Sequence, residues 1–335
     1  MYFAGIDAHA QYLQVAVLDK VGAVVAEGRV ESKEPEAIAR FLAPYRPLRV
    51  VVETCAFWPW IRDQLESEQV EFYLAHAREL RAIASRPQKN DAVDASLLAR
   101  MLRADLIPRA QARASTALET LRLVRHYAWL TRYRTMFANR IHGQLFQNGI
   151  HLGREVLLTR AGREKLTTLQ SRLAPEQQRL IRTHYVMIVR VNEMLRGLRK
   201  RIRRAARESA RASLLQSIPG IGPYWGLLLS AELDPIERFR SADHLVSYAG
   251  LAPVTRASGG HVRHGPVPAA ANRWVRGAFV AAVMSHVRHA PTSRLTRFYE
   301  SQKTRIGWKK ARVATARKLA RITYSILRSQ RPWQG

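Results

Sequence analysis

The sequence predicts an α/β domain at the N-terminus, built on a mixed sheet, followed by a mainly helical remainder. Within the first hundred residues, short apolar runs of strand length alternate with turn residues and helical patterns. Residues 109–205 instead keep apolar side chains three and four positions apart over long stretches, the spacing of amphipathic helices. A length of 335 residues suits about two such domains.

Five apolar runs predict the strands of the first domain: YFAGID, YLQVAVLD, GAVVAEGRV, LRVVVET and VEFYLA. Three of them precede the first helical pattern, and the turn DKVG joins the second to the third, which indicates antiparallel neighbours. Helical patterns follow at about 34–43, 59–69 and 91–104. The run LRVVVE is continuously apolar and branched, as expected of a buried central strand. The sheet is therefore predicted to be mixed.

Four carboxylates stand at particular places on this frame. Asp7 ends the first strand and Glu53 ends the fourth, so neighbouring strands would bring both to one edge of the sheet. Asp91 and Asp94 lie three positions apart at the start of the following helix, on one face of it. Like charges so close favour hard divalent cations, Mg²⁺ or Mn²⁺, and two such ions about 4 Å apart catalyse phosphodiester displacement. The alternative for Asp91 is an acid favoured by the helix dipole.

The charge predicts a polyanionic partner. Lys and Arg number 55 against 26 Asp and Glu, a net charge of +29, and the excess lies entirely beyond the first hundred residues, which carry −2. The basic remainder is interpreted as a nucleic acid clamp, with a solvated basic surface as the alternative. The single cysteine, Cys55, is interpreted as structural and fits a reducing compartment. No apolar run approaches a membrane span, so a cytoplasmic, nucleoid-associated protein without membrane contact is expected.

The helical remainder divides into an arm and a C-terminal part. Two long amphipathic stretches, separated by the region around RLAPEQQ, predict an antiparallel coiled-coil arm over 109–205. The segment LLQSIPGIGPYWGLLLSAEL then resembles a helix-hairpin-helix element, in which Gly220 and Gly222 permit a tight turn and backbone N–H groups hold a phosphate. A plain helical turn is the alternative.

These motifs together resemble a known family. The segments GIDAHAQYLQVAVLD, VVVETCAFW and KNDAVDASLLAR look like the three parts of the RuvC-like, RNase H-like DEDD domain of the insertion-sequence 110 family of bacterial transposases, which also contains Piv-type DNA invertases. The stretch from FRSADHLVSYAG onward is similar to the C-terminal transposase domain of that family, and the likeness extends to the closing basic helix. The resemblance implies a RuvC-like domain at 1–108, a helical arm at 109–205 and a transposase domain at 206–335.

The resemblance also implies a mechanism and partners. The matching position for the family's serine nucleophile is Ser258 in RASGGHVRHG, with Ser247 a weaker candidate, and the DEDD acids Asp7, Glu53, Asp91 and Asp94 complete a composite site. Arg256, Arg263, Asn272 and Arg276 are the candidate nucleic acid contacts, although AAANRWVRG keeps only the Asn and Arg of the family's usual Lys-x-Gly-Asn-x-x-Leu-Arg. Implied partners are donor and target DNA, a structured bridge RNA and further copies of the chain, in a dimer or tetramer.

Two alternatives remain open at the level of sequence. One is a RuvC-like, structure-specific endonuclease in which metal-activated water attacks the DNA and Ser258 is only a loop residue. The other is a non-catalytic nucleic acid-binding scaffold, against which the intact acid quartet argues. Composition does not distinguish RNA from DNA as the bound polyanion.

Overall fold

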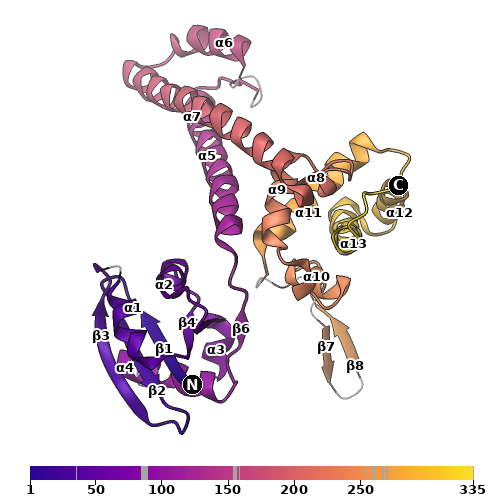
Figure 1. Ribbon diagram of the computed structural model, residues 1–335. Coiled ribbons are helices and arrows are strands. Elements are labelled where there is room, and N and C mark those ends of the chain that lie inside the picture. The colour runs from indigo at the N-terminus through magenta and orange to yellow at the C-terminus, as the bar shows by residue number, and fades with distance from the viewer. Residues whose placement is uncertain are drawn as a thin grey trace. The chain divides into compact units, whose positions relative to one another are not determined.

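The computed structural model describes residues 1–34, 36–83, 90–153, 157, 159–253, 255–258, 261–265, 268 and 271–334. The chain forms two compact units, Met1–Ser115 and Thr116–Gly335 (Figure 1). The first is a mixed α/β unit and the second is mainly helical, as the sequence predicted. Every helix in the described residues is too short or too polar to cross a lipid bilayer.

The first unit is organised by a six-stranded sheet in the order β3-β2-β1-β4-β5-β6. The strand β1 pairs parallel with β4 and antiparallel with β2, and β4 pairs parallel with β5. The predicted mixed sheet is therefore confirmed, with the strand LRVVVE between β1 and β5. The strand bounds are β1 Tyr2–Ala8, β2 Tyr12–Leu18, β3 Val24–Glu31, β4 Leu48–Glu53, β5 Val70–Ala75 and β6 Arg109–Ala110.

Helices cover both faces of this sheet. On one face α1 (Ala37–Leu42) and α2 (Trp58–Leu65) pack on Ile6 and Val52. On the other, α3 (Ala77–Ile83) and α4 (Asp91–Arg103) pack on Phe3 and Val51. Successive strand residues point to opposite faces, so a continuously apolar strand buries both sides. The sequence analysis did not predict α3 or the two-residue β6.

The second unit begins with the arm. Its helices are α5 (Ser115–Phe146), α6 (Arg160–Gln170) and α7 (Pro175–Glu208). Near the base of the arm Leu130 packs with Leu195, and farther along α5 Ile141 packs with Ile181. Residue numbers rise along α5 as they fall along α7, so the two long helices are antiparallel, which confirms the predicted pair.

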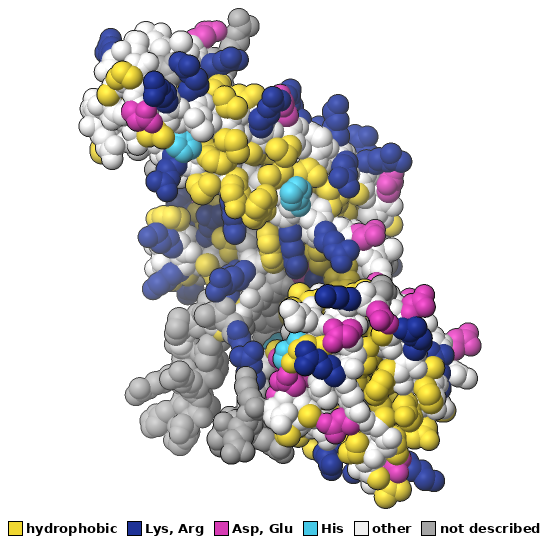
Figure 2. Space-filling view, turned by 90° about the vertical axis from the view of Figure 1, so that its left-hand side faces the viewer, with side chains coloured by type: hydrophobic (Ala, Val, Ile, Leu, Met, Phe, Trp, Pro, Cys, Tyr) yellow, Lys and Arg dark blue, Asp and Glu magenta, His cyan; other side chains and the backbone are white. Residues whose placement is uncertain are grey.

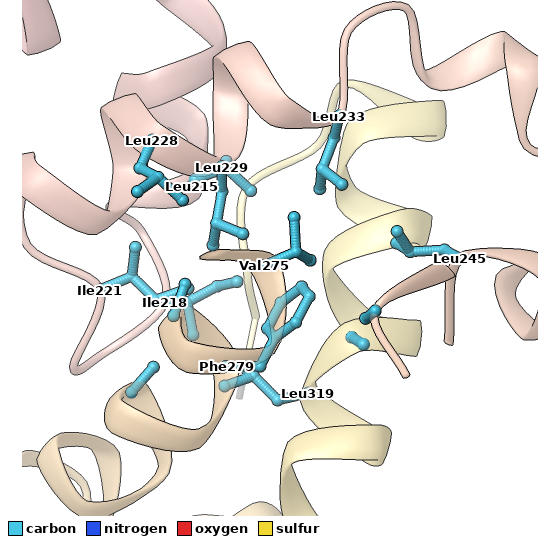
Figure 3. Close-up of a cluster of buried hydrophobic side chains, with 14 of the residues drawn as sticks. Leu215, Ile218, Ile221, Leu228, Leu229, Leu233, Leu245, Val275, Phe279 and Leu319 are labelled. Carbon is cyan, nitrogen blue, oxygen red and sulfur yellow. The ribbon is translucent and has the colours of Figure 1, made fainter. Parts of the chain in front are cut away.

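The base of the arm belongs to the largest hydrophobic cluster among the described residues. Leu121 of α5 and Ile202 of α7 belong to the same buried cluster as the C-terminal helices. Figure 3 shows the centre of this core, where the fully buried Phe279 lies among aliphatic side chains of other elements. The C-terminal elements are α8 Ala210–Leu215, α9 Pro223–Glu232, a 3-10 turn Ile236–Arg238, α10 Ala242–Tyr248, the hairpin β7 Thr255–Ser258 and β8 His261–His264, α11 Arg273–His289, α12 Arg294–Ile306 and α13 Trp308–Ser329.

The buried His286 makes the stability of this core depend on pH. Its Nδ1 lies 2.8 Å from the Pro219 carbonyl oxygen and its Nε2 lies 2.8 Å from the Ser293 hydroxyl. Burial lowers the pKa of His286 below its usual 6.5. Below pH 6.5 the unfolded chain binds a proton that the folded chain does not, so this group removes stability as the pH falls.

We therefore expect His286→Gln to reduce the loss of melting temperature between pH 7.5 and pH 5.5. The exposed His244 supplies a matched control, because His244→Gln should leave that loss unchanged. Thermal unfolding followed by circular dichroism measures both. Equal pH dependence in the two variants would contradict the assignment.

Candidate active site

The candidate site begins where β1 and β4 end. The parallel register pairs Ile6 with Val52, so the next residues, Asp7 and Glu53, lie beside each other at one edge of the sheet. Both acids line a small cavity of about 150 Å³, together with Asp94. The remaining lining residues are Leu80, Arg81, Leu97 and Leu98. Three of the four predicted acids therefore share one cavity, with a guanidinium at its wall.

Gly5 determines how closely α4 approaches these acids. A Cβ atom at this position would lie 2.1 Å from the Ala95 carbonyl oxygen and 2.6 Å from the Ala99 amide nitrogen, both backbone atoms of α4. Only glycine lets the helix backbone lie directly on β1. The contact brings the first turn of α4 over the end of β1, where Asn90 caps the helix by accepting a hydrogen bond from the Ala92 N–H.

Gly5→Ala should consequently destabilise the first unit by roughly 1–3 kcal/mol, the usual range for overpacking, or more because backbone atoms would have to move. Gly197→Ala is the matched control, since Gly197 lies exposed in α7 with no atom within 4 Å of an added Cβ. That change should stabilise the helix by roughly 0.5–1 kcal/mol. Chemical denaturation of both variants provides the comparison, and a Gly5→Ala protein as stable as the parent would refute the close approach.

Asp91 joins the site through a histidine and a tyrosine. The Tyr12 hydroxyl donates to Asp91 Oδ2 at 2.6 Å, and His9 Nε2 lies 3.0 Å from Asp7 Oδ2 and 3.4 Å from Asp91 Oδ2. The His9 and Tyr12 rings stack at 4.8 Å between centroids, and the Arg29 guanidinium lies 3.3 Å above the Tyr12 ring. One donor atom from each of Asp7, His9 and Asp91 falls within 4.8 Å of the others.

Burial and repulsion act on the same carboxylate. Burial raises the pKa of Asp7, the nearby His9 lowers it in part, and the charges of Asp91 and Asp94 raise it further. The hydrogen bond to Asp91 raises the pKa of Tyr12, so that hydroxyl stays protonated and keeps donating. Crowded carboxylates of this kind are relieved by a divalent cation, and their oxygen atoms are the ligands that Mg²⁺ and Mn²⁺ prefer. The residues present therefore fit such an ion.

The predicted nucleophile lies in the C-terminal hairpin. Ser258 is the last residue of β7 and pairs with His261, while Arg256 pairs with Arg263 of β8. The hairpin backbone is described, and the side chains of these residues and the glycines between the strands lie outside the description. The predicted roles of Ser258, Arg256 and Arg263 remain predictions.

Asn272 and Arg276 have structural partners. Asn272 Nδ2 donates to Glu232 at 2.7 Å and to the Tyr248 hydroxyl at 2.8 Å, while its Oδ1 accepts from the Trp274 and Val275 amides at the start of α11. No side-chain donor of Asn272 is left for a phosphate in this arrangement. Arg276 donates to the Pro268 carbonyl oxygen at 2.6 Å, so its guanidinium already has a backbone partner.

Glu232, which accepts a hydrogen bond from Asn272, is a buried carboxylate. The Glu232 side chain is fully buried, at 0% exposure, and Arg125 of α5 donates to it at 2.6 Å. A buried carboxylate needs such partners, since an unpaired one would lose its hydration without compensation. Glu232 thus ties the arm to the start of α11.

The predicted helix-hairpin-helix glycines occupy the turn between α8 and α9. Gly220 has a φ of +95°, and an added Cβ would lie 2.4 Å from the His286 amide nitrogen of α11. Gly222 caps α9, and no atom lies within 4 Å of an added Cβ there. Gly220 is therefore required for packing, and the open side of the turn is at Gly222.

Sequence reasoning missed His9, Tyr12, Arg81 and Glu232. A signal for His9 existed in GIDAHAQY, where a histidine follows the acid Asp7 by only two residues. Glu232 also left a signal, as the only acid in the apolar helix PYWGLLLSAE. The sequence offered none for Arg81, because its place in the cavity depends on how α3 packs.

Comparison with known proteins identifies the family. A transposase family model of the DEDD type, associated with IS110, matches residues 4–148, and the model of the transposase IS116/IS110/IS902 family matches residues 212–300. The first contains all four acids and the second contains Ser258.

Individual relatives agree with this result. The chain is 22% identical over 98% of its length, and 90% of the relative's, to the transposase for insertion sequence element IS1111A of Coxiella burnetii. It is 34% identical to the pilin gene-inverting protein of Moraxella bovis over 37% of its length and 38% of that protein. It is 30% identical to a 43.6 kDa protein of insertion element IS110 from Streptomyces coelicolor over 41% of its length, and so covers only 33% of that relative. The chain belongs to the IS116/IS110/IS902 family of transposases.

Proposed function

We propose that the protein is a transposase or site-specific recombinase of an insertion sequence that cleaves and rejoins DNA. The observation that carries this proposal is the shared cavity of Asp7, Glu53 and Asp94, in a chain whose family is that of transposases. We assign the catalytic domain to 1–108, the arm to 109–205 and the transposase domain to 206–335.

The acids would hold a divalent metal ion beside the DNA phosphate. Asp7, Glu53, Asp91 and Asp94 are the proposed ligands of Mg²⁺ or Mn²⁺, which when bound supplies positive charge to the phosphate oxygens and polarises an attacking hydroxyl. His9 and Tyr12 orient Asp7 and Asp91 through the 3.0 Å and 2.6 Å contacts. Support for the ligand set comes from the raised pKa of Asp7, which reflects burial and the neighbouring negative charges.

Ser258 is the proposed nucleophile. Its hydroxyl oxygen forms a bond to phosphorus as the bond to one deoxyribose oxygen breaks, and the serine proton is passed to the leaving oxygen through solvent or a basic neighbour. One phosphoester replaces another, so the covalent intermediate conserves the energy needed for a deoxyribose hydroxyl of the second DNA to reverse the attack and rejoin the strands. Arg256 and Arg263 supply positive charge near the phosphate.

The proposed partners are donor and target DNA, a structured bridge RNA that pairs with both, and a second copy of the chain. Support for the second copy comes from large hydrophobic side chains exposed along the arm, Trp129 and Met136 on α5 and Met187 and Met194 on α7. In the upper part of Figure 2, where the arm helices lie, hydrophobic side chains gather between those of Lys and Arg. A dimer or tetramer would bury this surface and join two DNA sites.

The test uses the full-length protein expressed from its native locus. Sequencing the RNA and DNA that copurify with it should recover a structured non-coding RNA from beside the gene, together with the ends of the element. Incubation with Mg²⁺ and DNA carrying those ends should give a protein–DNA adduct that survives denaturation. Free DNA ends without an adduct would instead identify a metal-dependent nuclease, and absence of both products would reject DNA cleavage.

A further inference from the structure

A second charged cavity lies in the helical unit, formed mainly by α12 and α13. It encloses about 1010 Å³, at the upper limit of the roughly 300–1,000 Å³ usual for small-molecule sites. Among the described residues, its lining contains six cations and no carboxylate. The cations are Arg305, Lys309, Lys310, Arg317, Lys318 and Arg321.

The cations differ in what they contact. Arg317 donates to the Leu251 carbonyl oxygen and Arg321 pairs with Asp243, so these two hold the walls. Lys309 and Lys310 are exposed in the first turn of α13, and no carboxylate among the described residues forms an ion pair with either. Lys318 lies 4.5 Å above the Phe298 ring, which fixes its position. The cavity is therefore lined by lysine ammonium groups next to apolar side chains such as Phe298 and Val313.

Two features fit a nucleic acid strand. Trp308 lies next to Lys309 in the chain, just outside the lining residues; it is 55% exposed, and Lys309 Nζ lies 5.4 Å from its ring centroid. An exposed ring beside cations suits a stacked base with its phosphates. Pro253 and Gly265, which flank the hairpin on its two sides, both line the cavity. The cavity thus opens at the base of the hairpin that carries Ser258.

We propose that this cavity, the α12–α13 groove, binds the backbone of the DNA strand that flanks the phosphate attacked by Ser258. The inference rests on the proposed function for the identity of that phosphate. DNA is favoured over RNA because the groove adjoins the Ser258 hairpin, the element to which the scissile DNA strand must come. Lys309 and Lys310 bind successive phosphates, and Trp308 stacks on a base.

The test compares two double variants in the full-length protein, each also carrying Ser258→Ala so that the DNA stays uncut. Lys309→Gln with Lys310→Gln removes two groove cations. Lys20→Gln with Lys33→Gln removes two exposed lysines from the first unit and serves as the matched control. Fluorescence anisotropy measures binding of a labelled DNA and of an RNA of the same sequence across a series of salt concentrations.

We expect the groove variant to bind DNA roughly tenfold more weakly than the control. Its plot of log affinity against log salt should be shallower by about 1.8 for duplex, because two phosphate contacts are lost. RNA binding should change less. A benzoylphenylalanine at position 308 should crosslink to the DNA near the cleavage site.

Three results would overturn the groove assignment. One is equal DNA affinity and equal salt slope in the groove variant and the control variant. Another is a groove variant that loses only RNA binding. Either result would reject the groove assignment and leave the proposed recombinase function standing. A parent protein that binds neither DNA nor RNA would overturn the proposed function and this inference together.

Discussion

Ser258→Ala should abolish both the covalent protein–DNA adduct and recombination, with DNA and RNA binding nearly unchanged. The reason is chemical: alanine lacks the oxygen that forms the bond to phosphorus, and every later step of strand exchange requires that bond. Ser258 lies at the end of β7, where pairing with β8 defines the backbone position, so the smaller side chain is not expected to disturb the fold. Denaturing gels with labelled DNA measure the adduct.

Ser258→Cys sharpens this comparison. A thiol keeps a nucleophilic atom at the same position, so some adduct should form, with a sulfur–phosphorus bond and a different lability. Ser247→Ala is the matched control, since Ser247 lies within α10 and should be dispensable for chemistry. A Ser258→Ala protein that still recombined DNA would reject the serine mechanism and favour attack by metal-activated water.

Asp7→Asn should have two opposite effects, a loss of DNA cleavage of at least roughly a hundredfold and a gain in thermal stability without divalent metal. Asp7 lies at the centre of the acids, and burial together with Asp91 and Asp94 raises its pKa. Because the pKa of this carboxyl is higher in the folded than in the unfolded chain, its ionisation at neutral pH lowers the free energy of unfolding. The asparagine amide of the variant is uncharged, so this loss of stability is absent. The rise in melting temperature caused by Mn²⁺ in the parent protein should also disappear.

Glu53→Gln should reproduce the loss of cleavage, because Glu53 lines the same cavity. Glu68→Gln is the matched control, since it makes the same chemical change at an exposed position of the same unit. Cleavage assays and melting curves with and without Mn²⁺ cover all three variants. Retained cleavage in both Asp7→Asn and Glu53→Gln would show that the acids do not hold a catalytic metal.

The predictions that depended on local pattern agree with the structure. Alternation and apolar continuity located the five longer strands, and the three- and four-residue spacing located α5 and α7 and indicated their antiparallel pairing. The positions of strands and helices can be predicted from residues close together in the sequence, because the periodicity of each element follows from its backbone geometry. The strand β6 escaped because two residues cannot show an alternating pattern, and α3 escaped because it spans only about two helical turns.

The sequence by itself determined the fold class, the division of charge and the four acids at element ends. Only the tertiary structure decided that Gly5 lets α4 lie on β1, that His9 and Tyr12 join Asp7 to Asp91, and that Asn272 is held by the buried Glu232. These contacts join residues as far apart as Tyr12 and Asp91, 79 positions along the chain. Whether two such residues meet depends on which elements pack together and in what register. The packing of the whole core determines this, because a close-packed interior allows few arrangements of its elements.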